Sequence, residues 1–239
     1  MSRPDTAMVL AAGLGVRMRP LTETRPKPLV ELAGRTLLDR ALDRLTAAGV
    51  RRIVVNTHYL AEMIRDHLAG RDDIVLSYEN ERLETGGGVR RALPLLGARA
   101  FFVVNSDAVW RDGAAPALDR IADAWDDARM DALLLLQPTG AAEGYSGNGD
   151  YHRETNGALR RRGPDESAAF VHAGVQILHP RLFEGSPDGA FSLNLLYDRA
   201  QAACRLFGLA HDAAWYHVGT PEDLARTEAA FARGPDRAE

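Results

Sequence analysis

Residues 10–29 read Leu-Ala-Ala-Gly-Leu-Gly-Val-Arg-Met-Arg-Pro-Leu-Thr-Glu-Thr-Arg-Pro-Lys-Pro-Leu. This stretch overlaps a short apolar run at 7–11, which has the length of a β-strand. A strand that leads into glycines and then into clustered cations predicts a phosphate-binding loop, because ligands of open α/β sheets bind at the carboxyl ends of the strands. Gly13 and Gly15 allow close backbone approach. Their N–H groups can surround a polyphosphate together with the nearby cations, which are Arg17, Arg19 and Lys27.

Spacing excludes two other phosphate-binding motifs. The dinucleotide fingerprint Gly-x-Gly-x-x-Gly fails because its sixth position is Met18. The ATPase loop fails because no Gly-Lys-Ser/Thr follows the glycines. Gly-x-Gly alone leaves open a glycine-rich turn with solvated arginines.

Apolar runs of strand length alternate with helical patterns through most of the chain. We expect strands at 7–11, 52–56, 74–78, 101–104, 132–136, 170–178, 205–209 and 214–218. We expect helices at 36–48, 60–69, 88–96, 115–129 and 193–203, and a last helix from Pro221 with Thr220 as its N-cap. Residues 138–169 lack this periodicity and are interpreted as an insertion of short strands and loops. The alternation predicts an α/β fold with a doubly wound, mixed and mostly parallel sheet.

Composition excludes several classes of protein. The net charge of −4 disfavours a nucleic-acid partner. No apolar run approaches the roughly 20 residues that span a bilayer, so we expect no membrane partner and a cytoplasmic location. Cys204 is the only cysteine, which excludes an internal disulfide, and it is expected to be a small core residue on a helix. Lys27 is the only lysine among 29 basic residues.

The string at 10–29 resembles the signature of sugar-1-phosphate nucleotidylyltransferases, and the similarity extends to about residue 225. Leu83-Glu84-Thr85-Gly86-Gly87-Gly88 is similar to the second nucleotide loop of that family, and Asn105-Ser106-Asp107 to its metal-binding strand end. Residues 173–175 resemble the sugar-site strand, and 215–221 the second metal segment. The resemblance implies a Rossmann-like, GT-A-like fold. It also implies a single domain over 1–233, with a nucleotide-binding half at 1–136, a sugar-binding half at 137–233 and a tail at 234–239.

Three segments are most similar to one branch of that family, the small N-acetylmuramate α-1-phosphate uridylyltransferases of peptidoglycan recycling. They are 83–88, 92–97 and 178–185. The main alternative is the branch of guanylyltransferases for mannose or heptose 1-phosphate, whose loop usually reads Leu-Gly-Thr-Ala-Gly. CTP with a small alcohol phosphate, or a non-catalytic module that binds nucleotide sugars, also stays open. Oligomeric state is not readable from the sequence.

The resemblance implies a set of site residues for a nucleoside triphosphate and a sugar 1-phosphate. Arg17 would hold the leaving pyrophosphate, Lys27 would lie between the two reacting phosphates, and Asp107 would bind Mg²⁺. Nucleotide contacts are expected from Leu10, Ala11, Ala12, Gly13, Gly15, Arg17, Glu79, Thr85, Gly86 and Asn105. In this set Thr85 and Gly86 would offer backbone groups to the base, with Thr85 capping a helix that begins near Gly88. Sugar contacts are expected from Asn105, Asp150, Gly174 and Asn194.

His217 departs from the family pattern, which places an aspartate there as the second metal ligand. Imidazole suits Mn²⁺, Zn²⁺ or Co²⁺ better than Mg²⁺, so Mn²⁺ becomes an alternative metal. Two other roles stay open for His217, namely a contact with phosphate or metal-bound water, and a structural role. Related enzymes often hold the sugar phosphate with a lysine near the insertion, a role that would fall here to an arginine such as Arg153. The remaining polar residues of this region are expected to be solvated surface: His152, His172 and Arg160–Arg162.

Overall fold

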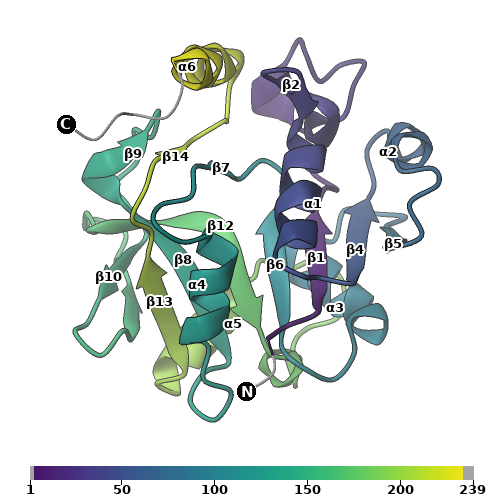
Figure 1. The fold of residues 1–239 in the computed structure, drawn as a ribbon. Coiled ribbons are helices and arrows are strands. Elements are labelled where there is room, and N and C mark those ends of the chain that lie inside the picture. Colours follow the sequence, from purple (N-terminus) through teal and green to yellow (C-terminus); the bar gives the residue numbers. More distant parts are fainter. Residues whose placement is uncertain (1–2, 234–239) are drawn as a thin grey trace.

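A nine-stranded mixed sheet forms the centre of the computed structural model, which describes residues 3–233 (Figure 1). Seven strands follow the order β11-β10-β12-β6-β1-β4-β5, and β8 pairs with both β12 and β13. Strands β1, β4, β5 and β6 are mutually parallel where they pair, whereas β12 is antiparallel to β6, β8 and β10. The bounds are β1 Thr6–Leu10, β4 Arg52–Thr57, β5 Ile74–Tyr78, β6 Phe101–Asn105, β8 Ala132–Pro138, β10 Tyr151–Arg153, β11 Leu159–Arg161, β12 Phe170–Leu178 and β13 Leu206–Ala210.

Helices cover both faces of this sheet, as the apolar runs of its strands require. Successive residues of β1 enter different apolar clusters, with Val9 on one face and Met8 on the other. Helices α1 and α4 pack on the Val9 face, and α3 and α5 pack on the Met8 face. The α/β class with a mostly parallel sheet is therefore confirmed. The helices are α1 Leu37–Ala47, α2 Ala61–His67, α3 Glu84–Leu96, α4 Ala117–Ala124, α5 Asn194–Ala202 and α6 Pro221–Ala232.

Two smaller sheets lie beside the main one. A three-stranded sheet joins β7 (Val109–Trp110), β14 (Trp215–Tyr216) and β9 (Ala142–Glu143), so it ties the segment after β6 to the predicted insertion and to the C-terminal region. A hairpin joins β2 (Glu31–Leu32) to β3 (Arg35–Thr36). Four 3-10 helices complete the fold, η1 Val16–Met18, η2 Lys27–Leu29, η3 Thr139–Ala141 and η4 Pro180–Phe183.

Threonine N-caps start α1 and α6, and only the cap of α6 was predicted. The Thr36 side chain accepts a hydrogen bond from the Asp39 N–H at 3.0 Å. Thr220 and Asp223 form a capping box around Pro221, so the predicted start of the last helix is confirmed. This cap fixes where the chain leaves the 215–220 segment.

Several predicted boundaries were wrong. Helix α3 begins at Glu84 rather than near Gly88, and α4 ends at Ala124 rather than at 129. Cys204 is exposed rather than buried, because it follows the end of α5 in a left-handed conformation (φ 56°). The predicted tail at 234–239 lies outside the described residues. No helix within 3–233 is long and apolar enough to cross a membrane.

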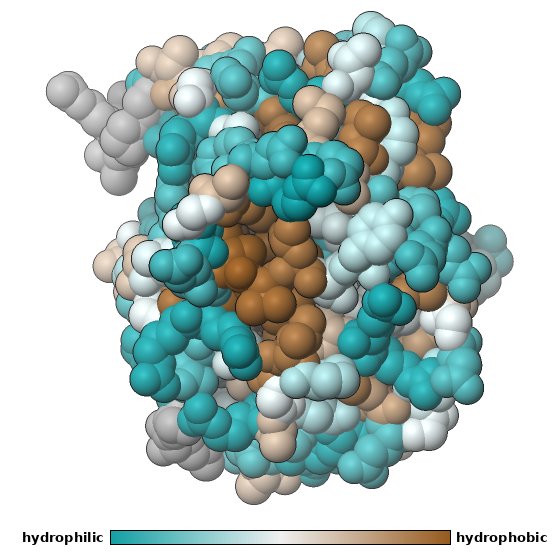
Figure 2. Space-filling view, turned by 90° about the vertical axis from the view of Figure 1, so that its right-hand side faces the viewer, coloured by the Kyte–Doolittle hydropathy of each residue, from teal (hydrophilic) through white to brown (hydrophobic). Residues whose placement is uncertain are grey.

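The side of the molecule that carries β5 and α2 shows apolar side chains gathered in a hollow, with polar side chains around it (Figure 2). Strand β5 is the edge of the main sheet on this side. Its first three residues, Ile74 to Leu76, are only half-buried.

Candidate active site

A cavity of about 210 Å³ lies at the carboxyl ends of β1, β4 and β6, where an open α/β sheet binds its ligands. We call it the nucleotide pocket. Its lining comes from five separate segments of the chain, namely Leu10, Ala12, Gly13, Lys27, Pro28, Asn56, Glu79, Arg82, Glu84, Thr85, Asn105, Ser106 and Asp107. The pocket therefore brings together most of the residues that were expected to contact the nucleotide. Ala11, Gly15, Arg17 and Gly86 are the expected contacts that do not line it.

A buried hydrogen-bond chain fixes two walls of the nucleotide pocket to each other. The Asn56 carbonyl oxygen accepts from the Ala11 N–H at 2.8 Å, and its amide nitrogen donates to Glu79 Oε1 at 2.7 Å. Glu79 Oε2 accepts in turn from the Leu83 N–H at 3.1 Å. Asn56 and Glu79 are 2% and 1% exposed, so this chain connects β1 to the start of α3 without water.

Gly15 holds the loop after β1 in shape. Its φ of +63° lies in the left-handed region, and a Cβ there would approach Thr22 and Lys27 side-chain atoms to 3.0–3.1 Å. The Thr22 hydroxyl donates to the Gly15 carbonyl at 2.7 Å. Gly15 thus shapes the loop that delivers Lys27, which explains its place outside the pocket lining.

Lys27 and Asp107 form an ion pair inside the nucleotide pocket. The Lys27 side chain is 13% exposed and that of Asp107 is 37% exposed. Pro26 and Pro28 flank Lys27 at the start of η2, which fixes the backbone that carries the ammonium group. The Lys27 ammonium and the Asp107 carboxylate are partners of each other here. When a phosphate and a cation bind, the ammonium would contact the phosphate and the carboxylate would contact the cation.

His217 lies close enough to this pair and to Arg17 to be coupled to them electrostatically. Burial lowers the pKa of His217, and the positive charges of Arg17 and Lys27 act in the same direction. Asp223 and Asp107 raise that pKa, but by less than the lowering effects together. Arg17 is exposed on η1 and has no hydrogen-bond or ion-pair partner among the described residues, so its charge is available to an anion.

The donor set around Asp107 fits a cation that takes few protein ligands. Within residues 3–233 no three His, Cys, Asp or Glu side chains cluster as a complete metal site. Mg²⁺ usually keeps water and takes one or two carboxylates together with substrate phosphates, and Asp107 supplies one such carboxylate. Asp223 is not a free second carboxylate, because it accepts from Gly219 N and Thr220 N and contacts Arg226.

The 83–88 segment is used differently from what the sequence predicted. Thr85 lines the nucleotide pocket, but its hydroxyl accepts from the Leu193 N–H at 3.0 Å instead of capping a helix at Gly88. The Gly86 N–H donates to the Phe191 carbonyl at 2.8 Å, and a Cβ on Gly86 would lie 2.3 Å from the Phe191 ring. The Gly86 N–H is therefore already bonded within the protein, and the wider prediction that Thr85 and Gly86 offer backbone groups to the base stays a prediction. Gly86 permits α3 to pack closely on 189–193.

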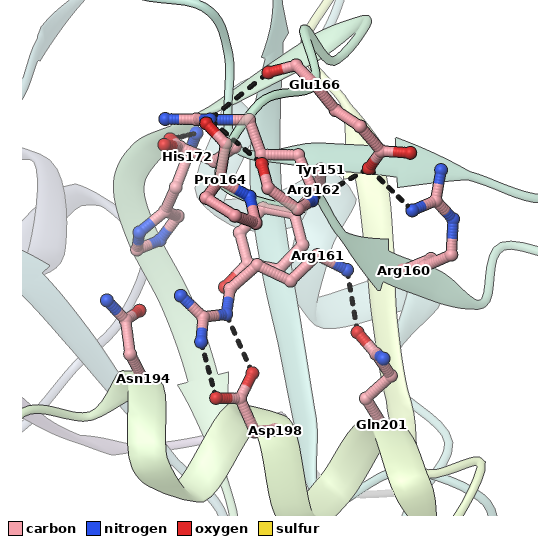
Figure 3. Close-up of a pocket in the computed structure, with 12 residues that line it drawn as sticks. Tyr151, Arg160, Arg161, Arg162, Pro164, Glu166, His172, Asn194, Asp198 and Gln201 are labelled. Atoms are coloured by element: carbon pink, nitrogen blue, oxygen red, sulfur yellow. Dashed lines mark hydrogen bonds and ion pairs between the residues drawn. The ribbon is translucent and has the colours of Figure 1, made fainter.

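A second, larger cavity of about 1010 Å³ lies on the insertion side of the site (Figure 3). We call it the arginine pocket, and its lining is Asp150, Tyr151, Arg160, Arg161, Arg162, Gly163, Pro164, Glu166, His172, Asn194, Asp198 and Gln201. Arg160 pairs with Glu166 at 2.8 Å, and Arg161 forms a two-pronged pair with Asp198 in the middle of α5 (Figure 3). Arg162 donates only to backbone carbonyls, at 2.7 Å to Gly149 and 3.1 Å to Gly163, and no described carboxylate pairs with it.

The arginine pocket collects two of the four predicted sugar contacts, Asp150 and Asn194. Asp150 also accepts from the His172 backbone N–H at 2.9 Å, which fixes its carboxylate against β12. Asn105 lines the nucleotide pocket instead. Gly174 lines neither cavity but lies against Asn105, since a Cβ there would be 3.1 Å from the Asn105 amide nitrogen. Asn105 and Gly174 thus lie at the nucleotide pocket, and Asp150 and Asn194 lie at the arginine pocket.

The prediction of a solvated surface was wrong for the two histidines of this region, because the Nε2 atoms of His152 and His172 are buried without a hydrogen-bond partner among the described residues. Arg160 is exposed, as predicted, whereas Arg161 and Arg162 are half-buried, and all three line the arginine pocket. Burial lowers the pKa of His172, although Asp150 opposes this. Arg153 does not line the cavity and donates instead to the Gly208 carbonyl at 2.8 Å, so it is badly placed for the expected phosphate contact.

Asn56 and Arg82 line the pocket but were not among the residues that the sequence predicted. Asn56 could have been found, because it follows the apolar run 53–55 just as Asn105 follows 101–104. Glu84 belongs to the 83–88 segment that resembles a nucleotide loop, although it was not singled out there. Arg82 carried no such signal, and its position in the wall depends on α3 beginning four residues earlier than its apolar pattern indicates.

The chain belongs to the nucleotidyl transferase family, whose model matches residues 6–147. Two N-acetylmuramate α-1-phosphate uridylyltransferases are similar to it over nearly their whole length. That of Caulobacter vibrioides is 45% identical, with 96% of this chain and 98% of the relative covered. That of Neisseria meningitidis serogroup B is 32% identical, with 93% and 96% covered. A mannose-1-phosphate guanylyltransferase of Mycobacterium tuberculosis is 26% identical, with 95% of this chain and 65% of the relative covered.

Solved structures share the fold. A UDP-glucose pyrophosphorylase in complex with UDP-glucose superposes with a TM-score of 0.79 at 16% identity, over 96% of this chain and 98% of that one. The likeness at this level of identity concerns the arrangement of the sheet and helices. It confirms that a nucleotidyltransferase fold was correctly inferred from the 10–29 motif.

Proposed function

We propose that this protein transfers a uridylyl group from UTP to N-acetylmuramic acid α-1-phosphate, which releases pyrophosphate and forms UDP-N-acetylmuramic acid. One observation carries the proposal, the 45% identity over 96% of the chain to an enzyme of that activity. The Lys27–Asp107 pair in the nucleotide pocket supports it, because it places a cation and a carboxylate where two phosphates and a metal would meet. Guanylyl transfer is less well supported, since the guanylyltransferase relative is more distant at 26% identity.

The reaction requires the protein to bring two anions together. An oxygen of the sugar phosphate attacks the α-phosphorus of UTP, and the bond from that phosphorus to the oxygen bridging to the β-phosphate breaks. A phosphate monoester is largely ionised at neutral pH, so no general base is required. Charge neutralisation and alignment then supply most of the acceleration. The Lys27 ammonium would leave Asp107 for the reacting phosphates, and Arg17 would hold the pyrophosphate oxygens.

Mg²⁺ is the metal we propose, held by Asp107 and by the nucleotide phosphates. When bound, it would neutralise charge on the triphosphate. His217 is the second candidate ligand, and its imidazole leaves Mn²⁺ as an alternative.

The acceptor would lie along the path from Asn105 past Gly174 to the arginine pocket. Asp150 and Asn194 would contact its hydroxyl or amide groups. Arg162 is better placed than Arg153 to receive an anionic group of the acceptor, because it lines the arginine pocket and has no described carboxylate partner. The proposed reaction would take place in the cytoplasm, in the recycling of peptidoglycan sugars.

A pyrophosphate-release assay tests the proposal. The assay combines UTP, GTP, CTP and dTTP with the 1-phosphates of N-acetylmuramic acid, N-acetylglucosamine, mannose and heptose, in Mg²⁺ and in Mn²⁺. We expect the highest kcat/KM for UTP with the muramic acid phosphate, and an Asp107→Asn variant as the inactive control. Faster release from GTP with mannose or heptose phosphate would replace the proposal by guanylyl transfer. Nucleotide binding without release from any pair would indicate a non-catalytic module.

A further inference from the structure

Glu84 has an unusual backbone conformation. Among the described residues other than glycine, four have a positive φ: Ala33, Leu60, Glu84 and Cys204. Ala33 precedes Gly34 in the tight turn between β2 and β3, and Cys204 follows the end of α5, both of which are usual places for a left-handed residue. Leu60 is the N-cap of α2, and Glu84 has a φ of 58° at the first residue of α3. It is also the only one of the four that lines the nucleotide pocket.

Contacts on both sides of Glu84 hold this conformation. The Leu83 N–H donates to Glu79, and the Leu83 carbonyl accepts from the Phe191 N–H at 3.2 Å. Gly86 and Gly87 donate to the Phe191 carbonyl at 2.8 and 3.2 Å. The left-handed region is disfavoured for a residue with a Cβ, and it persists only where neighbouring contacts impose it. A glycine at position 84 would meet the same constraints without strain.

No contact of the Glu84 side chain within the protein compensates for the strain of this left-handed backbone. It is exposed at the pocket wall, and within residues 3–233 its carboxylate has no hydrogen-bond or ion-pair partner. An acidic group in the first turn of a helix gains a little from the helix dipole, but any conformation of the backbone at that position allows this gain. The carboxylate is therefore available to a ligand.

Charge determines which part of the ligand Glu84 can face. A carboxylate beside a triphosphate would be repelled, so it suits only the part of the pocket away from the phosphates. Lys27 is the cation proposed to meet the phosphates. Glu84 instead follows Leu83, the last residue of the hydrogen-bond chain that runs through Asn56 and Glu79, and Arg82 and Thr85 line the pocket beside it. A carboxylate only accepts hydrogen bonds, and the donors of a nucleoside are the ribose hydroxyls and the N–H groups of the base.

We propose that Glu84 is a specificity-determining residue of the nucleotide pocket, whose carboxylate accepts a hydrogen bond from an N–H or O–H donor of the nucleoside. The left-handed backbone at the start of α3 presents the carboxylate to that donor. This inference rests on the proposed function only in taking a nucleoside triphosphate as the ligand of the pocket.

Two variants separate the carboxylate from the backbone strain. Glu84→Gln keeps the left-handed conformation and removes the charge, and Glu84→Gly removes both the side chain and the strain. Ala33→Gly relieves a left-handed residue outside the pocket and is the matched control. Calorimetry measures the Kd of UTP, 2′-deoxy-UTP, 3′-deoxy-UTP, 3-methyluridine triphosphate and pyrophosphate, and thermal unfolding gives the Tm.

We expect both Glu84 variants to weaken UTP binding at least tenfold, because a charge-assisted hydrogen bond is lost. The analogue that lacks the group donating to Glu84 should bind the wild type and Glu84→Gln equally. The identity of that analogue shows whether the donor is a ribose hydroxyl or the base N–H. Pyrophosphate should bind all variants alike. Glu84→Gly should have a raised Tm together with its weaker binding, whereas Ala33→Gly should leave the Kd of UTP unchanged.

An unchanged Kd of UTP in both Glu84 variants would overturn the proposal. An equal loss for UTP and every analogue, or a loss for pyrophosphate, would also overturn it, because the effect would then be one on the whole pocket and not on a donor of the nucleoside. If the wild type binds GTP more tightly than UTP, the same series is run with GTP and its matching analogues. Binding is measured without an acceptor, so failure of the muramic acid phosphate as a substrate would leave this test intact.

Discussion

Lys27 is unusual both in the composition of the chain and in its position in the structure. It is the only lysine beside 28 arginines, and the structure pairs it with Asp107 in the nucleotide pocket. A compact ammonium on a flexible stem can move from a carboxylate to a phosphate, whereas a planar guanidinium favours a fixed fork. We expect Lys27→Ala and Lys27→Arg both to lower kcat by about 100- to 1000-fold, the usual cost of losing one preorganised charge contact. Steady-state pyrophosphate release measures this.

The fold should tolerate both Lys27 variants. Asp107 is 37% exposed, so water can solvate its carboxylate once the ammonium is gone. The Tm should therefore stay within a few degrees of the wild type. Arg35→Ala, which breaks the exposed pair with Asp43, serves as the control with unchanged kcat. Full activity of Lys27→Arg would show that the lone lysine is an accident of composition.

His217 is the residue where this chain departs from its family, and its substitution addresses the metal. The imidazole is half-buried against Trp215 and Tyr145, with ring centroids 6.1 and 5.9 Å away. If it is a metal ligand, His217→Asp should raise the ratio of activity in Mg²⁺ to activity in Mn²⁺ about tenfold, since Mg²⁺ prefers oxygen. Activity titrated separately with each metal gives this ratio. An unchanged ratio would assign His217 to a phosphate contact or to packing.

At the scale of elements, α3 depends on glycine for its packing. A Cβ on Gly86 would meet the Phe191 ring at 2.3 Å and the Phe191 carbonyl at 2.8 Å, and neither can move without displacing the 189–193 segment. We expect Gly86→Ala to destabilise the fold by about 1–3 kcal/mol, the usual cost of overpacking. Thermal or urea unfolding measures this. Gly140→Ala is the control, because a Cβ at Gly140 meets nothing within 4 Å. If Gly86→Ala had a normal Tm but bound UTP weakly, the result would support the contact between Gly86 and the base that the sequence predicted.

The elements that the sequence predicts well are those with a strong local signal. The strands 74–78 and 170–178 match β5 and β12 to the residue, because their apolar runs end at polar or turn residues. The start of α3 was missed because three successive glycines hide the helical pattern, and tertiary contacts to Phe191 hold those residues in the helix. In this case long-range packing overrides local propensity.

The site was predictable where its residues follow strand ends, and not where they depend on side-chain pairing. Leu10, Asn105 and Asp107 could be placed from the apolar runs before them. The arginine pocket could not, because a run of three arginines has the same appearance in a sequence whether it is solvated or lines a cavity. Only the pairing of Arg160 with Glu166 and of Arg161 with Asp198 distinguishes the two cases.

At the scale of the whole molecule, Asp112 joins elements that the main sheet does not connect. Its carboxylate accepts from Arg44 of α1 at 2.5 Å, from the Trp110 indole at 3.1 Å and from the Ala117 N–H at 2.9 Å, at the start of α4. Burial raises the pKa of Asp112, but the Ala117 N–H and the Arg44 charge lower it by more, so it lies below its ordinary value.

The sign of the resulting pH dependence follows from that lowered pKa. A carboxyl group with a depressed folded-state pKa stabilises the protein above its unfolded-state pKa, near 4, and this contribution is lost as the pH falls through the folded-state pKa. We expect Asp112→Asn to lower the free energy of unfolding by about 1 kcal/mol at pH 7, a modest value because Arg44 is partly solvated. The difference from wild type should shrink as the pH falls below about 4. Urea unfolding from pH 3 to pH 8 measures it, with Asp188→Asn as a control because its 98% exposed carboxylate should contribute nothing measurable at any pH. A difference that stayed constant over this range would mean that Asp112 acts through its hydrogen-bond geometry alone and not through its charge.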